Sequence, residues 1–397
     1  MPFIKAYFKN LADLLKSKRV LNILLLILLL VTFLTGKIYD DNFFLKFFLV
    51  LFVLTFVIQN LLLLKKSYLL YICRLILFFL IGFQIVWVIR LKTETMEKKF
   101  GLLRLEDNLL GDRLRPNMQG EGMIGLWGNE TLYHILFSTD SLGRRISEDS
   151  IPTGTLSENP KKHAIFYGCS FTFGEGIAYS STFPALFEQQ RPDFKSYNYG
   201  VDGWGPHQTA LLFDKRVNTI NRSTIKEPEG FVLYTFIPDH LERVFGGSNY
   251  FAWAPLTSPD VYVENDSLIV KPRKQTRLYL SRLLNGIGLA RLLKINIHYP
   301  HTESFYTRFA DIINYSATQY WKMNPTGQFY IGIYPSYAGC DLEWIQYLDP
   351  KIQVFQPPAP VDYEQNKDKY HIPHDGHPTE ALNAYYVEKI MELMNED

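Results

Sequence analysis

The chain of 397 residues is poor in cysteine and carries almost no net charge. Its three cysteines, Cys73, Cys169 and Cys340, are too few for a small domain held together by disulfides. The 41 basic residues nearly balance the 40 acidic ones, so nothing favours nucleic acid as a partner. Internal repeats are absent, and low-complexity tracts are absent outside residues 20–92, which excludes a repeat protein.

Long apolar runs are abundant near the N-terminus. Each approaches the ~20 residues that a helix needs to cross a bilayer, and together they cover residues 20–35, 43–64 and 68–91. We therefore expect residues 1–92 to form a membrane anchor with about three transmembrane helices. A cleavable signal peptide is disfavoured, because the leader is long and basic and no small-residue cleavage site follows the first run.

Basic residues predict the orientation of this anchor. The leader before the first run contains Lys5, Lys9, Lys16, Lys18 and Arg19. The positive-inside rule then places the N-terminus in the cytoplasm, and three spans place the chain from residue 93 onward outside it. Basic residues after the third run count weakly against this orientation: Arg90, Lys92, Lys98 and Lys99. We expect a multi-pass membrane protein whose soluble domain is periplasmic or at the cell surface.

Strand and helix patterns alternate in the rest of the chain. Apolar runs predict strands at residues 163–167, 195–199, 230–237, 328–334 and 351–355. Helical patterns cover residues 182–190, 206–215, 275–293, 303–321, 341–347 and 379–394. The alternation predicts an α/β fold with a mostly parallel sheet and helices on both faces. We expect this domain at residues 161–397, with an irregular insertion at 245–274, and a connecting region at 93–160 that packs on it and contains a strand at 132–139.

The most informative motif follows the first predicted strand and reads Gly168-Cys169-Ser170-Phe171-Thr172-Phe173-Gly174-Glu175-Gly176. A serine among glycines at a strand-to-helix turn is how an α/β fold presents a nucleophile at the carboxyl edge of its sheet. Such a serine needs a base to remove its proton. An ordinary strand-exit turn gives the same pattern, so the motif alone leaves the role of Ser170 open.

A second motif near the C-terminus, His374-Asp375-Gly376-His377-Pro378, can supply a base and an acid. His377 is the candidate general base, and Asp375 would orient its ring and stabilise the imidazolium. In the alternative interpretation, Thr379 or Asp375 caps the last helix and His377 lies on the surface. A metal site is a weaker alternative, with the candidate ligands His371, His374, Asp375 and His377. We expect neither a metal nor a cofactor.

Two further turns follow predicted strands. Gly203 lies after the second strand, where a glycine lets a backbone N–H approach a developing oxyanion. After the third strand come three candidate substrate contacts, Asp239, His240 and Arg243. For Gly203, the alternative is a glycine-rich turn that binds no ligand. For the residues after the third strand, the alternative is the capped start of a helix.

The order and spacing of these four elements resemble the SGNH/GDSL family of serine hydrolases, over roughly residues 130–394. Ser170 matches the nucleophile of the family's Gly-Asp-Ser-Phe/Leu block, and Gly203 matches its oxyanion glycine. Asp375 and His377 match the acid and the base of its last block. The resemblance implies a three-layer α/β/α sandwich and acyl transfer through an acyl-serine.

Three departures from the family pattern stand out. Cys169 replaces the Asp of the first block, which is not catalytic. Pro238 stands where the third block carries Asn, so one oxyanion donor is missing or is replaced by His207, Gln208 or His240. Losing one such donor typically costs ~2.7–4 kcal/mol of transition-state stabilisation. The Asp-x-His spacing is similar to that of the alginate acetyltransferase branch, which acts on a polysaccharide outside the cytoplasm.

Together, the anchor and the resemblance favour a membrane-anchored serine esterase or O-acyltransferase. Its substrate would be an acylated carbohydrate or a lipid-linked molecule of the cell envelope, and a membrane-embedded acyl-donor protein is a further candidate partner. Water as the acceptor gives an esterase, and a sugar hydroxyl gives a transferase; the sequence leaves the acyl group and the acceptor open. A non-catalytic carbohydrate-binding or scaffold protein is the alternative. A transport partner is disfavoured, because few charges lie inside the apolar runs.

Overall fold

The computed structural model describes residues 96–101, 103–147, 160–247, 250, 257–273, 279–280, 301–337 and 339–396. The chain divides into two compact units, and the unit formed by residues 96–278 and 297–397 contains all of these residues except 279–280. No helix within the described ranges combines the length and the apolar character needed to cross a bilayer. The three apolar runs and most of the helix expected at 275–293 lie outside the described residues.

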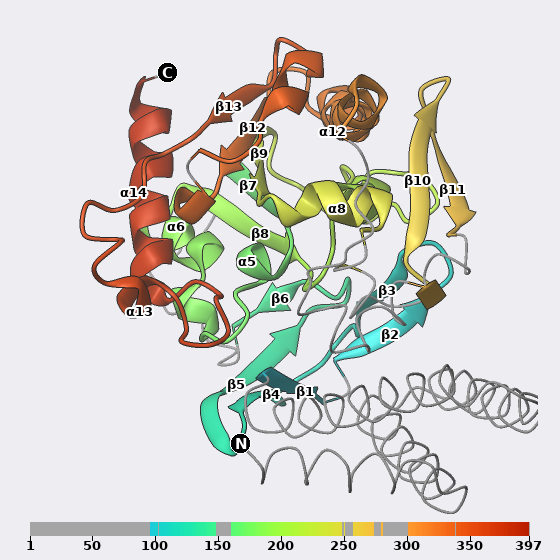
Figure 1. Ribbon diagram of the computed structural model, residues 1–397. Helices are drawn as coiled ribbons and strands as arrows, with labels where there is room; N and C mark the ends of the chain where they lie inside the picture. Colours follow the sequence, from blue (N-terminus) through green and yellow to red (C-terminus); the bar gives the residue numbers. More distant parts are fainter. Residues whose placement is uncertain are drawn as a thin grey trace, which may run out of the picture. The chain divides into compact units, whose positions relative to one another are not determined.

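A five-stranded parallel sheet, in the order β13-β12-β9-β7-β8, forms the centre of this unit (Figure 1). All five strands expected from the sequence are present: β7 (Lys162–Gly168), β8 (Phe194–Gly200), β9 (Glu229–Phe236), β12 (Gln328–Ile333) and β13 (Gln353–Phe355). Strand β7 lies between β8 and β9 and is almost wholly buried. Its apolar residues therefore run continuously instead of alternating with polar ones.

Helices cover both faces of this sheet. Along β7, Ala164 and Phe166 belong to one apolar cluster, and Ile165 and Tyr167 belong to another. The first cluster includes residues of α6 (Phe183–Gln190) and α14 (Glu380–Glu396), and the second includes residues of α12 (Glu303–Met323) and α8 (Asp239–Phe245). Because successive side chains of a strand point to opposite faces, the two clusters lie on opposite sides of the sheet. The three-layer α/β/α arrangement is therefore present.

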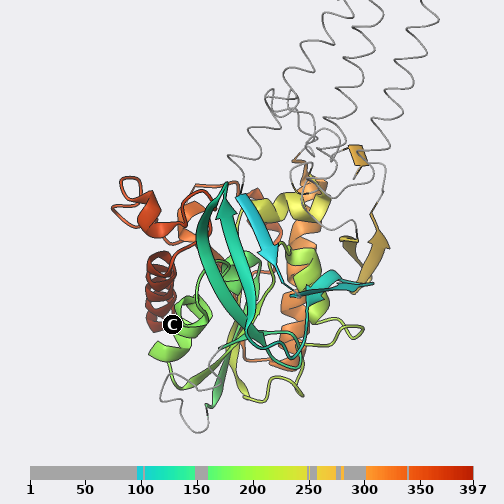
Figure 2. The same ribbon diagram turned by 90° about the horizontal axis from the view of Figure 1, so that it is seen from below.

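A smaller antiparallel sheet precedes β7 in the chain and has the order β1-β4-β5-β6 (Figure 2). Its strands are β1 (Met96–Phe100), β4 (Glu121–Trp127), β5 (Glu130–Thr139) and β6 (Arg145–Ile146). The strand expected at residues 132–139 is β5, but its partners were not predicted. Between β1 and β4 lies a hairpin of β2 (Arg104–Asp107) and β3 (Gly111–Leu114).

The insertion expected to be irregular at 245–274 contains a regular hairpin, which corrects that expectation. Its strands are β10 (Pro259–Glu264) and β11 (Ser267–Pro272). Asn265 and Asp266 connect them with φ angles of 49° and 55°. Two consecutive residues with positive φ form the tight turn whose twist suits a two-residue hairpin loop.

Two expected helices are shorter than the sequence suggested. The segment 206–215 contains α7 (Pro206–Thr209) and a 3-10 turn, η2 (Ala210–Leu212). It ends early because the Asp214 carboxylate accepts the backbone N–H of Arg216 at 2.9 Å, which competes with continued helix. The segment 341–347 holds only the 3-10 helix η4 (Glu343–Tyr347). The remaining short helices are α5 (Ser170–Phe173), η1 (Tyr179–Ser181), η3 (Pro335–Tyr337) and α13 (Lys367–Tyr370).

Candidate active site

The turn after β7 packs tightly against the end of β8. Helix α5 runs from Ser170 to Phe173 and is followed by Gly174, whose φ of 84° lies in the left-handed region that favours glycine. At Gly200, on β8, a side chain would overlap the backbone of Phe173. Close packing of a strand-to-helix turn on its neighbouring strand thus requires glycine at both positions. The motif is more constrained than an ordinary strand exit.

Arg145, on β6, holds this turn from the side of the small sheet. Its guanidinium is buried and donates hydrogen bonds to the carbonyl oxygens of Phe173 at 2.9 Å, Gly174 at 2.6 Å and Ile177 at 2.8 Å. These carbonyls lie outside the sheets, and the Gly174 oxygen also accepts a long hydrogen bond from the backbone N–H of Ile177 at 3.4 Å, so one buried side chain joins three points of the segment. No sequence pattern indicates this role, because Arg145 lies in the region expected to be a connector.

Ser170, His377 and Asp375 are linked by two hydrogen bonds. His377 Nε2 lies 2.7 Å from Ser170 Oγ, although the two residues are 207 positions apart in the chain. His377 Nδ1 lies 3.1 Å from Asp375 Oδ1. The loop is held in place by the hydrogen bond from the backbone N–H of Ile372 to the carbonyl oxygen of His377 at 2.8 Å. This is the arrangement of nucleophile, base and orienting acid that activates a serine.

The Asp375 carboxylate is kept ionised by its neighbours. Burial alone would raise its pKa, but the hydrogen bond and charge of His377 and the charge of Lys98 lower it to about 2. An ionised carboxylate beside Nδ1 fixes the ring orientation that directs Nε2 towards Ser170. It also stabilises the imidazolium that forms when His377 takes a proton.

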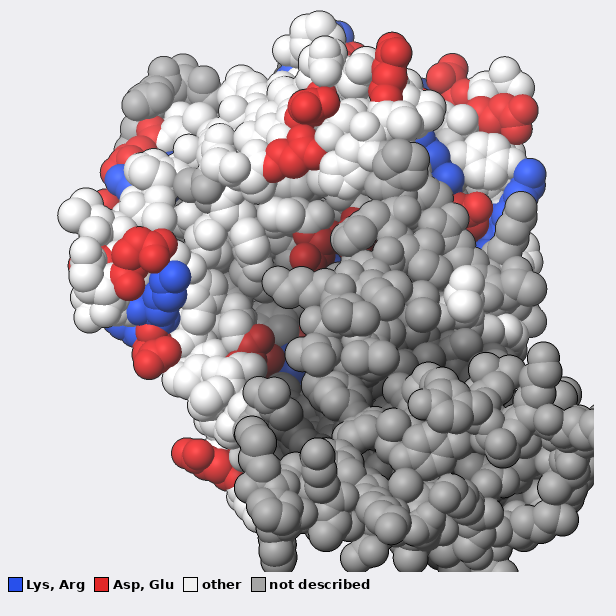
Figure 3. Space-filling view, viewed as in Figure 1, with Lys and Arg blue, Asp and Glu red and all other residues white. Residues whose placement is uncertain are grey.

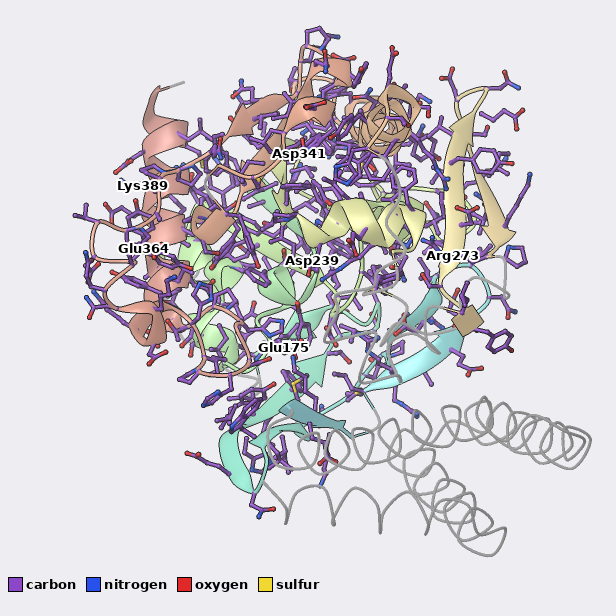
Figure 4. All side chains as sticks on the ribbon, in the orientation of Figure 1. Glu175, Asp239, Arg273, Asp341, Glu364 and Lys389 are labelled. Atoms are coloured by element: carbon purple, nitrogen blue, oxygen red, sulfur yellow. The ribbon has the colours of Figure 1, made fainter. Side chains whose placement is uncertain are left out.

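Two charged side chains that the sequence analysis did not assign complete the site. The ammonium group of Lys98, on β1, lies 2.8 Å from Asp375 Oδ1 and forms an ion pair with Glu175 Oε1. Glu175 Oε2 in turn lies 3.4 Å from His377 Nε2. Figure 4 places Glu175 between the turn after α5 and the strands of the small sheet. Glu175 belongs to the serine motif, and its position as a charged residue between two glycines could have indicated a role in the site. Lys98 carries no comparable signal, because in the sequence it is one of several basic residues after the third apolar run.

The electrostatics of Glu175 differ from those of Asp375. Its side chain is fully buried, and burial together with the negative charge of Asp202 raises its pKa to about 7. His377 and Lys98 act in the opposite direction without cancelling this effect. Burial would lower the pKa of Lys98, but the charges of Glu175 and Asp375 outweigh it and raise that pKa. The site thus contains two cations among several carboxyl groups: Lys98, and Arg104 on β2, which lies 3.1 Å from Asp202.

Gly203 lies directly after Asp202, in the turn that follows β8, and has a φ of 76°. Its backbone N–H as an oxyanion donor stays a prediction. The three candidates for replacing the donor that Pro238 lacks are buried and form hydrogen bonds elsewhere. Gln208 donates to the carbonyl of Leu110 at 2.8 Å, His240 pairs with the Tyr234 hydroxyl at 2.6 Å, and His207 lies 3.3 Å from Arg273. The contact of Gln208 argues against it as an oxyanion donor. His207 Nδ1 and His240 Nε2 are buried without a hydrogen-bond partner, so for the two histidines it is burial that argues against the role.

The candidate substrate contacts on α8 have different environments. Asp239 is largely exposed, with 69% of its side chain accessible, whereas Arg243 is buried and donates to the carbonyl of Trp204 at 2.7 Å. His240, as described, faces the core. The face that carries α8 is hollowed near its centre, and both uncharged and acidic side chains lie at the edge of the hollow (Figure 3). Of the three candidates, Asp239 is therefore the one whose side chain is free to meet a ligand.

Within the described part of the chain, one group of side chains is close enough to hold a metal ion: Glu175, Asp375 and His377. The ammonium of Lys98 already contacts both carboxylates and supplies a positive charge there. The four-residue metal site considered above is not assembled. His371 bonds the Tyr363 hydroxyl and the Gly376 carbonyl, and the His374 ring stacks on Trp127 at 4.3 Å.

No family model matches the sequence, and no curated protein matches it. Among solved structures, the chain is similar to an acetyl xylan esterase from the rumen bacterium Butyrivibrio proteoclasticus, with 11% identity and a TM-score of 0.35. That match covers 60% of this chain and 65% of the esterase. A member of the lipolytic G-D-S-L family from Veillonella parvula is 15% identical, with a TM-score of 0.30, over 58% of this chain and 97% of that protein. These two likenesses are too weak to show a family.

Proposed function

We propose that the protein is an SGNH-type serine esterase or O-acyltransferase that works through an acyl-Ser170 intermediate. The observation that carries the proposal is the pair of hydrogen bonds from Ser170 Oγ to His377 Nε2 and from His377 Nδ1 to Asp375 Oδ1, at 2.7 and 3.1 Å. The three residues come from the two motifs that resemble the family's first and last blocks.

The proposed reaction has two halves. Ser170 Oγ attacks the acyl carbonyl carbon while His377 Nε2 takes the hydroxyl proton, and the tetrahedral intermediate collapses as the leaving alcohol receives that proton. Water or an acceptor hydroxyl then loses a proton to His377, attacks the acyl carbon, and releases Ser170, which regains a proton from the imidazolium. Asp375 stays ionised throughout and stabilises the imidazolium in both halves.

Backbone groups would stabilise the oxyanion. The N–H groups of Ser170 and Gly203 are the proposed donors. Pro238 has no side-chain donor, and the nearby polar side chains of His207, Gln208 and His240 are buried, so a third donor would have to come from the substrate or be absent. A site with two donors would turn over activated esters more slowly than one with three, because the activation free energy would be higher by the ~2.7–4 kcal/mol typical of one donor.

The substrate and the location are proposed from the anchor. The three apolar runs and the basic leader support a multi-pass membrane protein whose catalytic unit lies outside the cytoplasm. A cell-envelope glycan or a lipid-linked molecule carrying a small acyl group fits that location, with a membrane-embedded acyl donor if the enzyme is a transferase. Ser170 is only 3% exposed, which favours a small acyl group over a long chain.

The test is hydrolysis of para-nitrophenyl acetate by the full-length protein in detergent, compared with Ser170→Ala. Turnover should be lost in Ser170→Ala and kept in Ser304→Ala, which removes an exposed hydroxyl at the start of α12. Equal turnover in the wild type and Ser170→Ala would refute the assignment of the nucleophile. The non-catalytic alternative, which Pro238 favours, predicts no turnover in any variant and no labelling of Ser170 by a fluorophosphonate probe.

A further inference from the structure

Lys98 reaches the catalytic residues from the small sheet, where β1 pairs with β4. Its ammonium nitrogen contacts Asp375 and Glu175 and lies 3.4 Å from His377 Nδ1. Side chains alternate along a strand, so the next residue, Lys99, points away; it is 59% exposed and lies 3.7 Å from Glu97. Two adjacent lysines thus differ in whether they touch the site.

Charged groups on several elements surround His377. They are Asp375, Glu175, Asp202, His371 and Lys98, with Tyr133 on β5 beside Asp375 and Glu175, and Arg104 on β2 paired with Asp202 at 3.1 Å. Asp202 thus has a cation of its own, whereas Asp375 and Glu175 lie next to the two ring nitrogens of His377. Neighbouring carboxylates repel each other, so a base in this setting needs a nearby positive charge that holds them in place.

Lys98 is placed to supply that charge and to fix the geometry. Its ammonium contacts Asp375, the partner of His377 Nδ1, on one side of the ring. It also pairs with Glu175, whose second oxygen approaches His377 Nε2, on the other side. One cation therefore restrains the carboxylates next to both ring nitrogens, and through them the direction of Nε2 towards Ser170.

We propose that Lys98 is a positioning residue of the reaction, which holds Asp375 and Glu175 on the two sides of His377 and so directs Nε2 towards Ser170. Strand β1 is then part of the catalytic machinery and not only a connector. The kinetic consequence rests on the proposed function, whereas the order of the His377 ring can be measured without any turnover.

The first measurement is NMR of histidine-labelled full-length protein in detergent at one fixed pH, with the His377 ring signals assigned by their loss in His377→Gln. Lys98→Met keeps the apolar stem and removes the charge, Lys98→Arg keeps the charge, and Lys99→Met is the matched control. The ring N–H signal of His377 beside Asp375 should be present in the wild type and in Lys99→Met, and should be broadened or lost in Lys98→Met, where no cation restrains the two carboxylates. Lys98→Arg should return towards the wild type.

The second measurement is the kcat and KM of ester hydrolysis by the same variants. In Lys98→Met kcat should fall about tenfold or more with little change in KM, because the lysine positions the base and does not bind the substrate. Lys99→Met should match the wild type. Lys98→Arg should recover part of the loss, which a merely structural role of the lysine would not predict.

The outcomes separate the two proposals. A His377 ring signal that is the same in Lys98→Met and Lys99→Met would overturn the inference, whether or not the protein hydrolyses esters. Loss of activity in Lys98→Met with an unchanged ring signal would show a role other than positioning His377 and would overturn it too. If the wild type neither hydrolyses esters nor labels at Ser170, the proposed function fails, and the ring signal still decides the role of Lys98.

Discussion

Glu175 is a fully buried glutamate whose pKa the fold raises. Burial and the charge of Asp202 raise its pKa to about 7, whereas a glutamate in an unfolded chain titrates near ~4.3. The folded protein therefore binds this proton more tightly than the unfolded chain does. The protonated carboxyl favours folding below about pH 4, and this contribution is lost as the pH rises towards 7.

Glu175→Gln should remove that pH dependence, because glutamine has a similar shape and does not titrate. Between pH 4.5 and 7.5, the free energy of unfolding of the wild type should fall relative to that of Glu175→Gln by about 1–3 kcal/mol. Urea unfolding at the two pH values measures this difference, with the exposed Glu264→Gln as the control. If the difference in the free energy of unfolding between the wild type and Glu175→Gln were the same at both pH values, the raised pKa of Glu175 would be contradicted.

Single residues were predictable where a short motif carried them. Ser170, Asp375 and His377 each lie in a glycine-containing turn next to a predicted element, and the structure brings the three together. Lys98 had no such signal, because its role depends on the pairing of β1 with β4. A long-range pairing of this kind leaves no local pattern in the sequence.

At the scale of elements, the central strands were predictable because helices cover both faces of the sheet and make each strand apolar throughout. Of the small sheet, β5 was expected as a strand at residues 132–139, whereas β1, β4 and β6 were not. Strand β1 reads MEKKF, with three charged residues in five, which resembles a surface loop more than a strand. The β10–β11 hairpin did carry a signal, the Asn265-Asp266 turn between alternating residues.

Strand β6 is only two residues long, yet through Arg145 it fixes the turn that carries the nucleophile. Arg145→Met should leave three carbonyl oxygens without this donor and lower the free energy of unfolding by about 2–4 kcal/mol. Activity should fall as well, since the turn would lose its fixed position. Denaturant unfolding and ester hydrolysis measure the two effects.

Arg113→Met provides the comparison for Arg145→Met. The Arg113 side chain is 45% exposed and lies 3.5 Å from Asp107, an arrangement typical of surface ion pairs that contribute at most about 1 kcal/mol. A loss of stability in Arg145→Met no larger than that in Arg113→Met would show that the hydrogen bonds to the turn are not what holds it.

At the scale of the whole molecule, the site draws on both sides of the boundary expected between residues 160 and 161. Lys98, Tyr133 and Arg145 precede it, and Ser170, Glu175 and the C-terminal loop follow it. The two parts also share one core, since Met123 and Phe137 of the small sheet belong to the same buried cluster as Tyr167 of β7. The catalytic unit is therefore the product of the connecting region and the parallel sheet together.

Dividing the chain near residue 150 should show this dependence. Residues 151–397 expressed alone should lose activity by about a hundredfold or more, because the turn and the base lose the groups that position them and apolar core is uncovered. Co-expression with residues 1–150 should restore much of the activity, and co-expression with residues 1–150 carrying Arg145→Met should restore less. Ester hydrolysis and fluorophosphonate labelling of Ser170 report the recovery. If residues 151–397 alone were as active as the full chain, the small sheet would be a cover over a site that is already complete, and neither Arg145 nor Lys98 would have the role assigned to it.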